Sequence, residues 1–109
     1  RMTCVAEALV PTDHARKYAA QLGKHWAHNL SFSEHGDDVH VVFPKGARGA
    51  DWPGDALVVL APEEGALRCR IEASAAGQRD GLKDAVARHV DRFAFREAPL
   101  QYDWIDSAS

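Results

Sequence analysis

Two short segments of the sequence combine basic residues with aromatic ones, a mixture that can bind metals or anions. The first is Lys24-His25-Trp26-Ala27-His28, and the second is Arg88-His89-Val90-Asp91-Arg92-Phe93-Ala94-Phe95-Arg96-Glu97. His25 and His28 stand three apart, so on a helix their side chains occupy neighbouring positions of one face. Both segments also carry apolar residues at helical spacing. Their chemistry therefore has to be weighed against a role in helix packing.

The histidines predict one candidate site, for a metal ion. If the two helices lie side by side, His89 can join His25 and His28 as a third ligand. Three imidazoles with an open position suit zinc or iron, and would make the protein a metal carrier or a metal-dependent enzyme. No cysteine or acidic residue stands at ligand spacing, and His25 and His89 both fall within apolar stripes. We therefore favour neutral, inward-facing histidines, with the metal site as the alternative.

The cations predict a second candidate site, for an anion or an acidic partner. Arg88, Arg92 and Arg96 recur every four residues, and Lys24 adds a fourth charge. Such cations can hold a phosphate, a carboxylate or an acidic protein surface. Asp84, however, stands four residues before Arg88 and can pair with it along the helix. A solvated charged flank is the more common meaning of this pattern, and a buried ion pair of Arg92 or Arg96 is a further alternative.

Aromatic residues gather around the same segments and predict either core packing or an apolar groove. They are Trp26, Phe93, Phe95, Tyr102 and Trp104. Core packing is the usual role, whereas a groove between the helices and the C-terminal residues would suit a small ligand or a peptide. Trp52 stands apart, in a segment rich in glycine and proline, so we expect it to be an exposed contact residue.

The elements that would position these residues follow the order β-α-β-β-β-β-α, with an optional last strand. We expect strands over 3–10, 30–34, 39–43, 56–61 and 67–73, and helices over 13–28 and from about 80 to 95. Residues 74–80 are expected to be a polar connection, and 100–105 a short strand or an extended tail. Consecutive strands with short turns form a mainly antiparallel sheet, and two amphipathic helices must cover one face of it. The sequence thus predicts an α+β two-layer sandwich in which the face of the sheet opposite the helices is exposed to solvent.

Bulk composition limits the class of protein. The 109 residues suit a single domain, and 46% hydrophobic with 27% charged residues is the balance of a soluble globular protein. A net charge of −3 lacks the basic excess typical of nucleic-acid binders. The longest apolar run, 56–61, is far shorter than the roughly 20 residues that span a membrane, and no signal peptide is expected. We expect a cytoplasmic protein with no nucleic-acid or membrane partner, in which Cys4 and Cys69 are reduced thiols on strands.

The motifs resemble domain-of-unknown-function family 2218, a group of small bacterial proteins. The matching residues are 13–18 and 21–28, then Ala61-Pro62, 89–97 and Trp104. The family often has cysteine at the position of Gly23 and phenylalanine at that of Trp26, and the segment 44–55 is longer here than usual. The resemblance implies a TATA-binding-protein-like arrangement, without implying nucleic-acid binding. It also implies an association with siderophore-interacting flavin reductases, and hence with iron metabolism.

No catalytic motif accompanies this resemblance. The sequence contains no nucleophile elbow, phosphate-binding loop or dinucleotide fingerprint. We therefore expect a small non-catalytic accessory or binding module, linked to iron and siderophore handling, whose protein partner contacts Trp52 and the flank from Arg88 to Arg96. The partner would be a siderophore-interacting flavin reductase or a similar protein. The chain is expected to be a monomer, or a homodimer formed through the outer face of the sheet.

Overall fold

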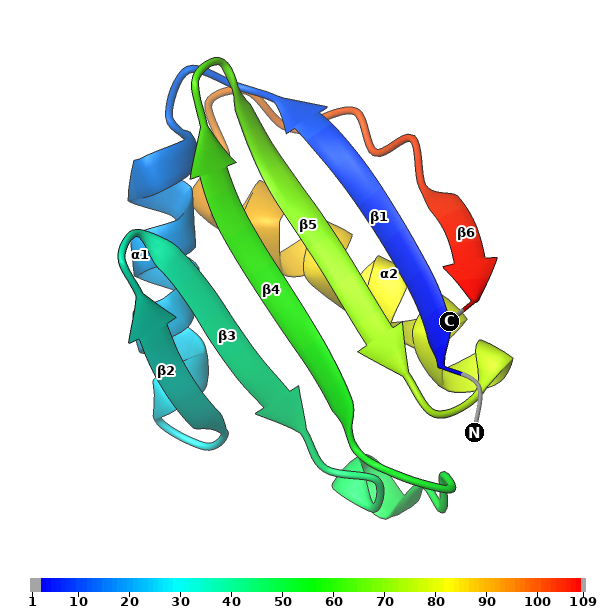
Figure 1. Cartoon of the computed structure of the whole chain (residues 1–109). Coiled ribbons are helices and arrows are strands. Elements are labelled where there is room, and N and C mark those ends of the chain that lie inside the picture. The colour runs from blue at the N-terminus through cyan, green and yellow to red at the C-terminus, as the bar shows by residue number, and fades with distance from the viewer. Residues whose placement is uncertain (1–2, 109) are drawn as a thin grey trace.

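A computed structural model describes residues 3–108 and shows a six-stranded sheet with two α-helices (Figure 1). The strands are β1 (Cys4–Pro11), β2 (Ser31–His35), β3 (Asp38–Phe43), β4 (Ala56–Glu63), β5 (Ala66–Ala73) and β6 (Ile105–Ala108). The helices are α1 (Ala15–Ala27) and α2 (Ala76–Phe93), and a short 3-10 turn, η1 (Ala47–Gly49), follows β3. Both helices lie behind the sheet in Figure 1. The predicted α+β two-layer sandwich and its element order are confirmed.

The sheet is antiparallel throughout and has the strand order β2-β3-β4-β5-β1-β6. Strands β2 to β5 form a meander, whereas β1 enters the sheet between β5 and β6. Two of the meander's turns are short, and Gly36 and Gly65 occupy them with φ of 64° and 76°. Residues other than glycine rarely adopt such values. The arrangement is consistent with the TATA-binding-protein-like fold.

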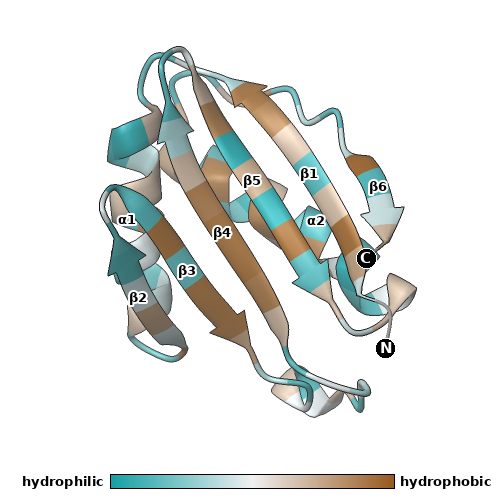
Figure 2. Ribbon diagram, in the orientation of Figure 1, coloured by the Kyte–Doolittle hydropathy of each residue, from teal (hydrophilic) through white to brown (hydrophobic). Residues whose placement is uncertain are grey.

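The core lies between the helices and the inner face of the sheet. Strand β5 alternates cleanly, with Leu67, Cys69 and Ile71 fully buried and the arginines between them turned outward (Figure 2). The fully buried large side chains include Leu22, Leu60, Val86 and Val90, which come from both layers. Alternation with a period of two on the strands and a stripe on each helix is what a two-layer sandwich requires. Within residues 3–108, no helix is long and apolar enough to cross a membrane.

Gly23 sets how closely α1 approaches the sheet. A Cβ atom at this position would stand 2.7 Å from Cε1 of Phe32 and 3.1 Å from Cγ1 of Val39. The bare glycine therefore lets the helix backbone lie directly against β2 and β3. This explains a glycine inside a helix, where it costs about 1 kcal/mol relative to alanine.

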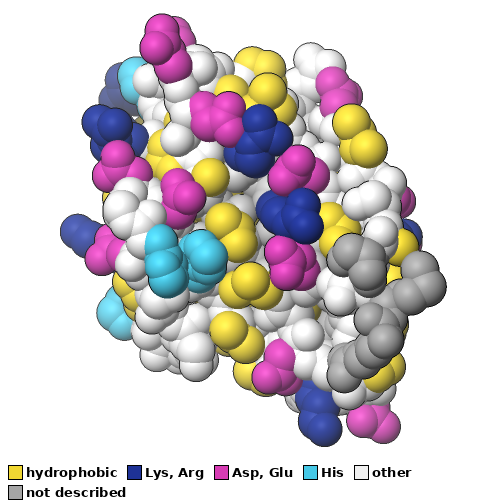
Figure 3. All heavy atoms as spheres, viewed as in Figure 1, with side chains coloured by type: hydrophobic (Ala, Val, Ile, Leu, Met, Phe, Trp, Pro, Cys, Tyr) yellow, Lys and Arg dark blue, Asp and Glu magenta, His cyan; other side chains and the backbone are white. Residues whose placement is uncertain are grey.

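The outer face of the sheet carries charged side chains over β5 and β1, with hydrophobic side chains between them (Figure 3). Arg68 pairs with Glu63 at 2.5 Å and with Glu7 at 3.2 Å, and Arg70 pairs with Glu72 at 2.9 Å. On the β2–β3 side, the rings of His35 and His40 are in contact, with centroids 4.2 Å apart and planes tilted by 42°.

Two carboxylates attach the segment after α2 to the rest of the fold. Glu97 accepts hydrogen bonds from the hydroxyls of Tyr18 and Thr12, the latter at 2.9 Å, and so links this segment to the start of α1. Asp91 accepts from the hydroxyl of Tyr102 at 2.7 Å and from the backbone N–H of Leu100 at 3.1 Å. The acidic residues of the second motif therefore hold the C-terminal segment rather than balance the nearby arginines.

Most elements shift by one or two residues from their predicted bounds, and the largest differences concern α2 and the last strand. Helix α2 begins at Ala76, because Gln78 satisfies the backbone before it: Oε1 of Gln78 accepts from the N–H of Ser74 at 2.8 Å. The expected polar connection is thus partly the first turn of α2. The helix ends at Phe93, and Phe95 is 70% exposed, so Phe95 does not pack under the C-terminal segment. The last strand lies over 105–108, later than expected.

Candidate functional site

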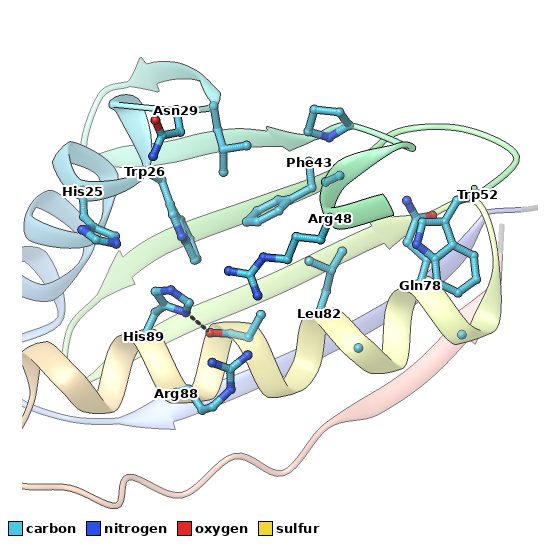
Figure 4. A pocket seen from close by; sticks show the side chains of 16 residues that line it. His25, Trp26, Asn29, Phe43, Arg48, Trp52, Gln78, Leu82, Arg88 and His89 are labelled. Carbon is cyan, nitrogen blue, oxygen red and sulfur yellow. Dashed lines mark hydrogen bonds between the residues drawn. The ribbon is translucent and has the colours of Figure 1, made fainter. Parts of the chain in front are cut away.

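A cavity of about 450 Å³ opens between the C-terminal end of α1, one side of α2 from Gly77 to His89 and the segment that contains η1 (Figure 4). Trp26 and Phe43 form its deep wall, with ring centroids 5.2 Å apart and planes nearly perpendicular. Leu82 of α2 closes the other side. Helix α2 presents Gly77 and Gly81 to the cavity, and no side chain from these positions fills it. Its size is within the ordinary range of small-molecule sites.

Arg48 reaches into this cavity from η1. Figure 4 shows its side chain extending between Phe43 and the α2 residues Arg88 and His89. The Arg48 backbone has φ 56° and ψ 35°, a left-handed conformation that costs a non-glycine residue roughly 1–2 kcal/mol. Strained residues of this kind are concentrated at binding sites.

The segment that carries Arg48 is anchored at its base. The backbone carbonyl of Gly54 accepts from Ser74 Oγ and from Gln78 Nε2, both at 3.0 Å. The indole of Trp52 lies so close to α2 that a Cβ at Gly77 would stand 2.9 Å from it. Trp52 is therefore half-buried against α2, whereas the sequence predicted a freely exposed residue. Its role in the structure is to hold the wall of the cavity in place.

His89 contributes an imidazole whose two nitrogens have different roles. Its Nδ1 stands 2.6 Å from the carbonyl oxygen of Ala85, one turn earlier in α2. Because a carbonyl only accepts hydrogen bonds, Nδ1 carries the proton and donates it. In the neutral ring Nε2 is then an acceptor, and within residues 3–108 it has no hydrogen-bond donor. The cavity is therefore lined by a free acceptor as well as by donors.

The cavity is cationic. Arg48 and Arg88 both line it, and none of its lining residues is an aspartate or a glutamate. In the part of the chain that the structure describes, neither guanidinium has an acidic partner. Asp84 does not form the expected pair with Arg88. Partial burial of the ring and the nearby His89 and Arg92 lower the pKa of His25, which also lies at the cavity.

The structure brings some of the predicted site residues together and separates others. His25 and His89 approach to 5.8 Å between ring centroids. His28 does not line the cavity, and no three His, Cys, Asp or Glu side chains among residues 3–108 are grouped to hold a metal ion. Lys24, Arg92 and Arg96 are exposed outside the cavity, and Arg96 lies over the ring of Phe95.

The expectation that both histidines face inward is wrong for His25, which is exposed. Gly23 and Trp26 occupy the buried stripe of α1, so His25 falls on the flank of the helix beside α2. His89 is half-buried, because the row from Leu82 through Val86 to Val90 occupies the centre of the α2 stripe.

Sequence reasoning missed Arg48 and Phe43 as parts of the site. Both come from a stretch without regular periodicity, and Arg48 reaches the cavity only through its left-handed backbone. One signal was present: Gly77 and Gly81 stand four apart on a helix, which removes two side chains from the same face.

The fold and the cavity together define a small two-layer α+β domain with a cationic, aromatic-lined pocket. By its sequence the chain belongs to the family of uncharacterized proteins conserved in bacteria designated domain-of-unknown-function family 2218, which it matches over residues 7–105. Its fold is similar to the NMR structure of PA4090 from Pseudomonas aeruginosa, with a TM-score of 0.71 and 19% sequence identity over 93% of this chain and 94% of that one. No curated protein matches the chain.

Proposed function

We propose that this protein is a small, non-catalytic binding module whose cavity takes a small organic anion. The observation that carries the proposal is the pair of guanidiniums, Arg48 and Arg88, which line one cavity that has no acidic residue in its walls. Both arginines are solvent-exposed, yet two like charges that line one cavity repel one another, and a bound carboxylate or phosphate would relieve that repulsion. The aromatic wall of Trp26 and Phe43 supports a ligand with an apolar body.

The biological setting of this ligand is proposed from the family resemblance alone. The association with siderophore-interacting flavin reductases supports a role in iron and siderophore handling, in which the module would present or store a small acid. A reductase of this kind would contact the exposed cations Arg92, near the end of α2, and Arg96, just after it, rather than the anchored Trp52. We propose that the module itself carries out no chemistry.

The binding proposal is tested by titrating the protein with benzoate, benzamide and inorganic phosphate while recording amide chemical shifts. We expect benzoate to shift residues of η1 and of α2 between Gly77 and His89, and neutral benzamide to bind at least tenfold more weakly. Arg48→Ala and Arg88→Ala should each weaken benzoate binding about tenfold or more, as expected for loss of a charge-assisted hydrogen bond.

The matched control is Arg96→Ala, which removes the same charge from a position outside the cavity. This variant should bind benzoate like the unmodified protein. If neither anion shifts cavity residues at about 10 mM, well above the roughly 1 mM Kd of a weak specific ligand, the binding proposal is wrong.

The alternative function is metal binding. The observation in its favour is the 5.8 Å approach of the His25 and His89 rings. Two imidazoles with open positions could bind zinc or iron with help from His28 or from a ligand. Elemental analysis of untagged protein, with melting temperature measured with and without chelator, tests this function. Substoichiometric metal and an unchanged melting temperature would exclude it.

A further inference from the structure

The polar groups of the cavity define more than the charge of the ligand, because one of them, the amide of Gln78, already has hydrogen-bond partners in the protein. Gln78 lines the cavity, but Oε1 accepts from Ser74 at 2.6 Å and Nε2 donates to Gly54 at 3.0 Å. Both polar atoms of its amide therefore already have hydrogen-bond partners in the protein. The groups left for a ligand on the α2 side and at η1 are the guanidiniums of Arg88 and Arg48 and Nε2 of His89.

These groups make complementary demands on a ligand. The guanidiniums donate hydrogen bonds and carry positive charge, so they require an anionic acceptor. With the proton on Nδ1, Nε2 of His89 is an acceptor, so it requires a donor. A ligand that was acidic throughout would leave Nε2 unmatched, and leaving a partly buried polar group unpaired is costly. The ligand should therefore present a carboxylate and, separately, a hydroxyl.

The walls of the cavity restrict the part of the ligand that joins its carboxylate to its hydroxyl. Trp26 lies against Phe43 at 5.2 Å and against His89 at 5.4 Å between ring centroids, and Trp26 is only 6% exposed. A wall of three aromatic rings favours a planar aromatic body. The volume of about 450 Å³ is near the lower end of small-molecule sites and suits a single substituted ring rather than a dinucleotide.

We propose that the cavity binds a monocyclic hydroxylated aromatic acid, with its carboxylate on Arg48 and Arg88, its hydroxyl donating to Nε2 of His89, and its ring against Trp26 and Phe43. The inference rests on the proposed anion-binding function and specifies its ligand class. It assigns His89 as the residue that distinguishes a hydroxylated acid from a plain one.

The test compares benzoate with its meta- and para-hydroxy derivatives, with the corresponding methoxy acids, and with cyclohexanecarboxylate. By calorimetry, the better hydroxy isomer should bind about tenfold or more tightly than benzoate, and its methoxy analogue should lose this gain because it cannot donate. Cyclohexanecarboxylate should bind more weakly than benzoate. The comparison needs only the unmodified protein.

A variant assigns the effect to His89. His89→Phe keeps an aromatic ring and removes the acceptor, so within this variant the roughly tenfold ratio between the benzoate and hydroxy-acid dissociation constants should fall to near one. Its amide spectrum shows whether it is folded. If the variant does not fold, the methoxy comparison still decides whether a donated hydrogen bond is recognised.

The outcomes separate the two proposals. If benzoate binds at the cavity but the hydroxyl adds nothing, or adds as much in His89→Phe, the ligand class is wrong and the anion-binding function stands. If cyclohexanecarboxylate binds as tightly as benzoate, the aromatic part of the inference is wrong. If no carboxylate binds, both proposals fail together.

Discussion

Glu97 shows what a single side chain of the second motif does. The hydroxyl of Tyr18, and then that of Thr12, hold the pKa of the Glu97 carboxyl below its usual value of 4.5. Tyr18 itself is buried, and burial together with Glu97 raises the pKa of its hydroxyl. The bond joins residues 79 apart in sequence, so it links the segment after α2 to the first helix.

Removing that hydroxyl should lower stability. We expect Tyr18→Phe to lower the free energy of unfolding by about 1–2 kcal/mol, because a hydrogen bond to a charged group is lost. The loss is limited because Thr12 still donates a hydrogen bond to Glu97. Urea unfolding measures this cost. A carboxyl with a depressed pKa contributes stability that is present above about pH 4.5 and lost as pH falls through the folded value. The difference between the two proteins should therefore shrink in acid, and a constant difference would contradict this role.

His25 also makes the stability of the fold sensitive to acid, through a basic group rather than an acidic one. Its pKa is lowered from 6.5 by partial burial of the ring and by repulsion from His89 and Arg92. The unfolded chain therefore takes up a proton first, and the folded protein should lose stability as pH falls from about 6.5 toward the folded value. Unfolding measured at about pH 8 and about pH 5 should show a smaller acid loss in His25→Gln. The same change at His40, on the far face of the sheet, is the control, and an equal reduction there would refute the assignment.

At the scale of the elements, the absence of a side chain has a different structural effect at each of two helical glycines. Gly23 allows α1 to touch the sheet, whereas a Cβ at Gly81 would meet no atom within 4 Å. Helix α2 gains nothing in packing from Gly81 and loses about 1 kcal/mol of helix propensity. What Gly81 does provide is open space in the wall of the cavity.

The two glycines should therefore respond oppositely to the same substitution. Gly81→Ala should raise the free energy of unfolding by up to about 1 kcal/mol. Gly23→Ala should lower it by about 1–3 kcal/mol, because its Cβ would overlap Phe32 and crowd Val39. Urea midpoints measured side by side give both values. If both substitutions stabilise the protein, the close approach of α1 to the sheet is not a constraint.

The same elements show how much of the fold could be predicted from the sequence. The period-two alternation of Leu67, Cys69 and Ile71 was enough to predict β5, and the apolar stripe was enough to predict most of α1. The start of α2 was hidden because glycines and polar residues in its first turns imitate a loop. The cavity could not be predicted at all. Its walls come from three distant segments, and the φ of 56° that directs Arg48 into it leaves no periodic signal.

At the scale of the whole molecule, Cys69 reports on the integrity of the core. It lies on β5 facing both helices, it is fully buried, and burial raises the pKa of its thiol to about 12. A buried, protonated thiol reacts with a disulfide reagent only when the structure opens.

We expect Cys69, in a Cys4→Ser background, to react at least about a thousandfold more slowly in the native protein than in urea. Its rate should rise in proportion to the fraction of unfolded protein as urea is added. A fast reaction in the native state would mean that β5 separates locally from the helices, and that the two layers do not unfold as one unit.

The position of β1 in the sheet has a consequence for how the chain folds. β1 precedes the other described strands in the sequence, yet its neighbours are β5, whose pairing joins Cys4 to Ala73, and β6, whose pairing joins Cys4 to Ala108. Such long loops close slowly, whereas the β2-to-β5 meander is local and can form early. During synthesis the apolar β1 therefore remains unpaired until its sheet neighbours β5 and β6 have been synthesised. Its residues Ala6, Ala8 and Val10 are then the ones most in need of protection from aggregation.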